Sequence, residues 1–134
     1  MLFTQKSEID IHEMSPLALA FVGDAVLELL VRARLVGTTR LQPNRLHTVA
    51  THYVSAHAQN LELDIIEPML TDAEAAVLRR GKNASKATVA KHATVQEYRA
   101  STGFECLLGW LYLQGRNDRI QVLFDALWEG YQPE

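Results

Sequence analysis

Apolar residues are densest in a stretch near the N-terminus of the chain. Ser15 and Pro16 are favoured at the N-cap and the first position of a helix, and Gly37 is typical of a helix end. Between these positions apolar side chains occupy nearly every face, which predicts a central, buried helix. Asp24 and Glu28 interrupt it one turn apart and so share a face. Because a buried, unpaired carboxylate is costly, we expect a cation beside them, either an arginine or a metal ion.

Helical signals continue along the rest of the chain, without strand alternation, repeats or a second domain. Pro43 predicts the start of a second helix that runs toward Leu61, and Pro68 predicts a break. Two capping boxes, Thr71–Glu74 and Thr94–Glu97, predict two further helix starts.

The predicted ends of the later helices complete an all-α pattern. Gly81 is expected to end one helix and to open an exposed loop, and Gly115 is expected to end the next. Asn117 is expected to cap a final amphipathic helix. The predicted fold class is therefore all-α with about six helices, in one domain over residues 1–134, with residues 1–14 as an N-terminal arm.

Composition agrees with a soluble globular domain: 48% of the 134 residues are hydrophobic and 22% are charged. Cys106 is the only cysteine and no secretory signal is present, so we expect a cytoplasmic protein. The net charge of −3 hides an uneven distribution, because five of the 13 Lys and Arg residues and none of the 16 acids lie between Ala75 and Gln96. This local cationic patch is a candidate phosphate-binding surface.

A second apolar helix, Phe104–Leu113, carries Glu105 as its only charge, and Gly109 would let another helix approach it closely. If the two apolar helices pack together, Asp24, Glu28 and Glu105 can converge. Converging carboxylates without a cysteine or histidine ligand set are typical of a Mg²⁺ or Mn²⁺ site. The alternative is neutralisation by nearby guanidinium groups, for which the candidates are Arg32, Arg34 and Arg99.

Several segments together resemble the ribonuclease III family, and specifically its Mini-III branch. They are Phe21–Leu29, Tyr53–Ala56, Arg79–Ala84, Gln96–Glu105 and Glu105–Gly109. The resemblance implies an all-helical, homodimeric endonuclease that cleaves double-stranded RNA with Mg²⁺, for which Mn²⁺ can substitute. It implies maturation of the ends of large-subunit (23S) ribosomal RNA, with a ribosomal protein as a candidate helper. It also implies that the double-stranded-RNA-binding domain of the longer enzymes is absent.

The resemblance assigns roles to individual residues. Asp24 and Glu105 match the catalytic, metal-binding acids. Ala20 and Thr102 stand where the longer enzymes carry a glutamate and an aspartate, so the site has fewer acids and a firmly held second metal is not expected. Glu28 and Thr102 are then expected to support the ligands rather than to bind the ion. The expected RNA contacts are Arg79, Arg80, Lys82, Asn83, Lys86 and Lys91.

Three other functions compete with this interpretation. One is a non-catalytic RNA-binding module that has lost a working set of acids. Another is a carboxylate-bridged di-iron bundle, which is disfavoured because no glutamate has a histidine three residues later. The third is a structural helical protein whose acids pair with Arg32 and Arg99.

Overall fold

The computed structural model describes residues 7–85 and 93–133, and within these ranges the protein is built from helices without a strand. The six α-helices are α1 (Pro16–Thr38), α2 (Pro43–Val54), α3 (Ala56–Ile66), α4 (Asp72–Ala84), α5 (Val95–Leu113) and α6 (Asn117–Gly130). Single 3₁₀ turns lie at Ile11–Glu13 and Glu67–Met69. The predicted all-α fold is confirmed. In the described ranges, none of the helices combines the length and the apolar character that crossing a membrane requires.

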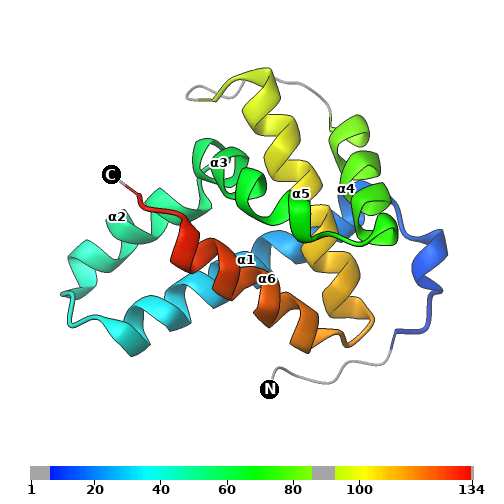
Figure 1. The fold of residues 1–134 in the computed structure, drawn as a ribbon. Coiled ribbons are helices and arrows are strands. Elements are labelled where there is room, and N and C mark those ends of the chain that lie inside the picture. Colours follow the sequence, from blue (N-terminus) through cyan, green and yellow to red (C-terminus); the bar gives the residue numbers. More distant parts are fainter. Residues whose placement is uncertain (1–6, 86–92, 134) are drawn as a thin grey trace.

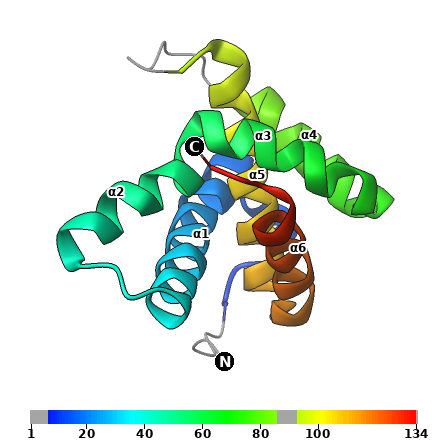
Figure 2. The ribbon, with the colours of Figure 1, turned by 60° about the vertical axis from the view of Figure 1, so that its left-hand side comes forward.

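Helix α5 passes through the middle of the molecule, and α1, α3, α4 and α6 pack around it (Figure 1). Its residues Phe104, Leu107, Leu108 and Leu111 are fully buried and join the core contributed by α1, α3 and α6. Helix α4 lies along one side of α5, and α2 projects at the edge of the molecule (Figure 2). The element that carries Glu105 is therefore the one with the fewest open faces.

Helices α1 and α5 touch through their backbones at two glycines. A Cβ atom on Gly23 would lie 1.6 Å from the backbone oxygen of Glu105, and one on Gly109 would lie 1.9 Å from the backbone oxygen of Leu19. Any side chain at these positions would push the helices apart. The close approach expected at Gly109 is thus present, and it recurs one residue before Asp24.

The predicted helix starts are confirmed at three hydroxyl caps. Ser15 accepts a hydrogen bond from the Ala18 backbone N–H, and Pro16 is the first residue of α1. Thr71 and Thr94 form complete capping boxes at α4 and α5, in which the glutamate three residues later accepts a hydrogen bond from the cap N–H. Gly115, with φ of 72°, follows the end of α5 as expected.

Two predicted boundaries are wrong. The helix expected from Pro43 to Leu61 breaks at Ser55, which has extended backbone and caps α3 through a bond from the Ala58 N–H. Gly81 lies inside α4, where a Cβ would come 2.7 Å from the Cys106 Cβ and 2.8 Å from the Gly103 Cα. This glycine allows α4 to pack closely on α5 and does not end the helix. The first basic residue after it therefore lies on a helix and not in the loop that was expected.

The start of α6 and the burial of α1 also differ from expectation. Asn117 is the first residue of α6 rather than its cap, and its side-chain oxygen is buried without a hydrogen-bond partner in the described part of the chain. Helix α1 is not buried all round, because the side chains of Phe21 and Val36 are 84% and 66% exposed. Because apolar residues lie on nearly every face of α1, the sequence pattern does not distinguish the face that packs in the core from the exposed face.

Glu62 is a charged residue in the core that the sequence pattern does not reveal. Its side chain, on α3, is completely buried, and neither carboxylate oxygen has a hydrogen-bond partner in residues 7–85 and 93–133. Burial raises the pKa of Glu62 to about 8. Burial, with a smaller contribution from the charge of Glu62, also raises the pKa of Tyr53. The folded protein therefore carries this carboxyl in its neutral form at pH 7.

Replacing Gly109 with alanine should destabilise the fold. The new methyl group meets the Leu19 carbonyl, so the free energy of unfolding should fall by about 3 kcal/mol or more. Gly37→Ala is the matched control, since nothing lies within 4 Å of a Cβ there, and it should be neutral or stabilising by up to about 1 kcal/mol. Urea unfolding of both variants measures the difference, and equal effects would contradict the close approach.

Glu62→Gln should change how stability depends on pH. Between the unfolded-state pKa of 4.5 and the folded-state pKa of about 8 the folded chain holds the extra proton, so wild-type stability falls as pH rises. The slope from this group approaches about 1.4 kcal/mol per pH unit. The variant should lose this contribution and exceed the wild type in stability above pH 8. Denaturant unfolding at several pH values tests this prediction. Parallel curves of stability against pH for the wild type and the variant would refute it. Asp64→Asn, on the exposed side of α3, is the control.

Candidate active site

The carboxyl groups of Asp24 on α1 and Glu105 on α5 lie close together, and Asp24 contributes to the raised pKa of Glu105. Gly23 places the α1 backbone directly against that of Glu105, so the two acids start from adjacent points on the two helices. The side chain of Asp24 is exposed, which differs from the buried position expected for it, and Glu105 is half-buried behind it. The pair thus forms a site that is closed on the α5 side and open to solvent on the α1 side.

The electrostatics of this pair favour a bound cation. Burial, with smaller contributions from the neighbouring carboxyl groups of Asp24 and Glu28, raises the pKa of Glu105 to about 8. A hydrogen bond from Gln59 acts in the opposite direction by favouring the charged form. Like charges held together in a partly desolvated place repel, and a positive ion between them removes that repulsion.

The three arginines proposed as alternative partners do not neutralise this pair. Arg32 bonds Glu28 one turn away, with its Nε 3.0 Å from Oε2. Arg34 pairs with Asp125 of α6 and lies over the ring of Phe124. The guanidinium of Arg99 donates to the carbonyl of Lys82 and to the side chain of Asn83, both at 3.0 Å.

Glu28 and Thr102, the two supporting residues expected from the sequence, have different surroundings. Glu28 is half-buried and contributes to the field at Glu105 while paired with Arg32. Thr102 is buried, and its hydroxyl donates to the Tyr98 carbonyl at 3.1 Å and contacts the Ser85 hydroxyl at 3.3 Å. The hydroxyl therefore ties α5 to the end of α4.

Gln59 of α3 is a site residue that sequence reasoning did not single out. Its Nε2 donates to Oε2 of Glu105 and to the backbone oxygen of Val54, both at 3.0 Å. The side chain is 1% exposed. A single glutamine within a helical pattern carries no signal of its own, and only the packing of α3 on α5 reveals this contact.

The donor set fits a hard divalent cation. In the described part of the chain, no group of three or more His, Cys, Asp and Glu side chains is arranged to hold a metal. Mg²⁺ is commonly bound by one or two carboxylates and keeps several waters, so a pair of acids open to solvent suffices. Cys106 is not a ligand candidate, because it is buried and burial raises the pKa of its thiol to about 11.

The basic residues expected to contact RNA lie on the last turns of α4 as far as the structure describes them. Arg79, Arg80 and Asn83 are exposed, and the half-buried Lys82 has its Nζ 3.6 Å from a carboxylate oxygen of Glu67. The other two, Lys86 and Lys91, lie outside the described residues.

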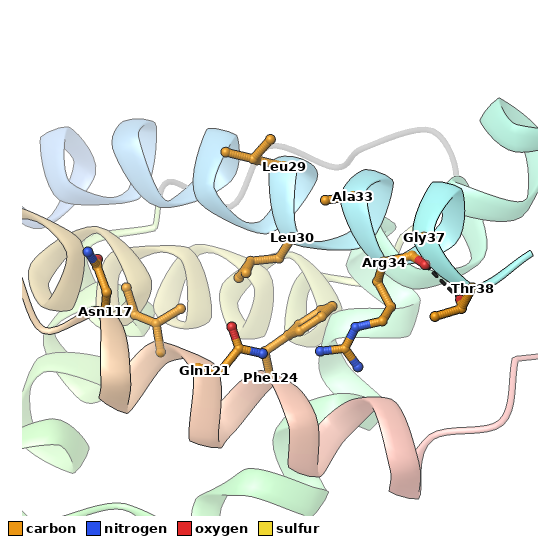
Figure 3. A pocket seen from close by; sticks show the side chains of 10 residues that line it. Leu29, Leu30, Ala33, Arg34, Gly37, Thr38, Asn117, Gln121 and Phe124 are labelled. Atoms are coloured by element: carbon orange, nitrogen blue, oxygen red, sulfur yellow. Dashed lines mark hydrogen bonds between the residues drawn. The ribbon is translucent and has the colours of Figure 1, made fainter. Parts of the chain in front are cut away.

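A separate groove of about 580 Å³ runs between α1 and α6. Leu30 points toward α6 and Phe124 across it, beside the guanidinium of Arg34 (Figure 3). The residues that line it include no carboxylate. Its apolar walls are unsuited to a metal ion, and the candidate catalytic chemistry stays with Asp24 and Glu105.

Comparisons with known proteins agree with the all-helical fold. The family model described as the ribonuclease III domain matches residues 17–116. The Mini-ribonuclease 3 of Enterococcus faecalis is 43% identical over 118 residues, which cover 87% of this chain and 89% of the relative. That of Symbiobacterium thermophilum is 44% identical over 113 residues, covering 84% and 87%. A crystal structure of a Fusobacterium nucleatum protein superimposes with a TM-score of 0.80 at 30% identity, covering 88% of this chain and 96% of that one.

Proposed function

The chain belongs to the ribonuclease III family and is an endoribonuclease of that type, acting on double-stranded RNA, and we propose that Asp24 and Glu105 form its active site. The observation that supports this most directly is the carboxyl pair itself. Two acids from different helices lie close together, one exposed and one half-buried, and in the described part of the chain the three arginines expected as their partners bond elsewhere. Such a pair is costly for folding and useful for catalysis.

The proposed cofactor is Mg²⁺, with Mn²⁺ as a substitute, held by Asp24 and Glu105. When bound there, the ion lowers the pKa of a coordinated water and offsets charge that develops on the phosphate. The chain's own residues then have three tasks. Asp24 presents a carboxylate at the open side of the site, Glu105 holds the closed side, and Glu28 with Arg32 borders the pair.

RNA binding is assigned to the end of α4. Arg79 and Arg80 are exposed, and Lys82 and Asn83 follow on the same helix, where their charges and amide can contact phosphate oxygens. Lys86 and Lys91 extend this assignment along the sequence. A duplex is then recognised by its shape, its phosphates and its 2′-hydroxyls across the minor groove.

A homodimer accounts for the uncovered apolar face of α1. Leu17, Phe21, Leu29 and Val36 are exposed, and their spacings of four, eight and seven residues place them within one face of the helix. A second copy of the chain is the proposed occupant. Asp24 borders this face, so the dimer would bring two acid pairs onto one duplex, one for each strand.

The proposed substrate is the precursor of large-subunit (23S) ribosomal RNA, cleaved in the cytoplasm, with a ribosomal protein as a candidate helper. The similarity to proteins named Mini-ribonuclease 3 supports this choice, because it extends over 87% of the chain and includes the segments around both acids.

Asp24→Asn should abolish cleavage while the protein stays folded. The exposed side chain has little part in packing, and the loss of one of two acids should lower the cleavage rate of a generic RNA duplex in Mg²⁺ by about 1,000-fold or more. Duplex binding in EDTA should persist. Asp118→Asn, an exposed acid on α6, is the control. Full cleavage by the Asp24 variant would refute the proposed site.

Phe21→Glu should convert the dimer to a monomer. A carboxylate at a position that is 84% exposed costs little in the free chain but is buried in the proposed interface. Light scattering should give twice the 15.0 kDa chain mass for the wild type and the single mass for the variant, with a matching loss of cleavage. Val122→Glu, on the exposed side of α6, should remain dimeric. A monomeric wild type would contradict the assignment.

A further inference from the structure

Gln59 joins a helix break to one of the catalytic acids through both hydrogens of its side-chain amide. One hydrogen goes to the backbone oxygen of Val54, and the other goes to Oε2 of Glu105. The side chain is 1% exposed, so water does not compete for these bonds. Both donor positions are therefore committed, and the amide group has no freedom to rotate without losing a bond.

The orientation of this amide follows from its neighbours. Val54 is the last residue of α2, where a carbonyl has no partner within its own helix, and a backbone oxygen can only accept a hydrogen bond. The nitrogen end of the amide must therefore face Val54, which leaves the second hydrogen for Glu105. The break at Ser55 exposes this carbonyl and also starts α3, so one local feature creates the acceptor and aims the donor.

The consequence for Glu105 is a fixed carboxylate. The Gln59 bond occupies Oε2, favours the charged form of the group and limits its rotation. Residues that bond a metal-binding carboxylate in this way orient it and raise its affinity for the ion. Glu28 and Thr102, expected from the sequence to have this role, have bonds directed to Arg32 and to Tyr98 and Ser85.

We propose that Gln59 is a positioning residue of the active site, which holds the carboxylate of Glu105 in its metal-binding orientation from the buried side. This inference rests on the proposed function, since it requires Glu105 to bind the metal. It adds a third helix, α3, to a site otherwise built from α1 and α5.

The test compares Gln59→Met with two other variants by titration with Mn²⁺ alone, followed by its electron paramagnetic resonance signal. Methionine matches the length of glutamine and cannot donate. Gln59→Met should weaken Mn²⁺ binding about 10- to 100-fold. At saturating Mn²⁺ it should lower kcat for duplex cleavage while KM for the RNA stays unchanged. Glu62→Gln, one turn further along the same buried face of α3, should leave Mn²⁺ affinity unchanged.

Glu105→Gln separates this inference from the proposed function. If Glu105→Gln leaves Mn²⁺ affinity intact, the proposed metal site is wrong. If Glu105→Gln abolishes binding and Gln59→Met has no effect, only the positioning role is wrong. If the role is correct, the effect of Gln59→Met should vanish in the Glu105→Asn background, where the shorter, uncharged side chain leaves no carboxylate to hold.

A structural role alone would predict a different result. Loss of the Val54 bond would lower the melting temperature. At temperatures well below the melting point, metal affinity and kcat would stay unchanged. If Gln59→Met does not fold, the wild type decides: the Gln59 side-chain amide resonances should shift on titration with Mg²⁺. Resonances that stay fixed while Mg²⁺ binds would overturn the proposal.

Discussion

The contact between the α1 and α5 backbones is the constraint on which the rest of the structure depends. At Gly23 and Gly109 the helices are closer than any side chain would allow. This contact places Asp24 beside Glu105, and it makes α5 the centre around which the other helices pack. The geometry of the proposed catalytic pair is therefore a product of the main packing contact of the fold. Loops, which in many enzymes carry the catalytic groups, contribute neither acid.

The same contact puts stability and catalysis in opposition. Two like carboxyl groups are held together where burial favours the neutral form of Glu105. The fold tolerates this because the surrounding core is apolar and closely packed, and because Gln59 supplies one compensating hydrogen bond. Glu62 adds a second buried carboxyl without any compensating bond in the described ranges. The molecule therefore holds more buried acid than the proposed catalytic site uses, at a cost in stability that rises toward alkaline pH.

Much of this structure could be predicted from local sequence signals, and the remainder depended on tertiary packing. Hydroxyl caps such as Ser15 act within one turn, so they fixed helix starts reliably. Gly81 was misassigned as a helix end because a glycine after a basic turn has that local meaning, whereas here it admits α5. Asp24 and Glu105 were proposed because each is an acid in an apolar helix and because both match acids of the ribonuclease III family. Gln59 was missed because its importance comes only from what α3 packs against.

The continuation of α4 past Gly81 has a mechanical consequence. The interlocked glycines of α4 and α5 leave no room for the two helices to slide, and the basic end of α4 is joined to the helix that carries Glu105. Arg79 and Arg80 would bind phosphates of the duplex at a constant distance from the bond that is cleaved. The fold would then set that distance. The position of the cleavage site relative to the bound phosphates would depend on the packed helices rather than on a flexible loop.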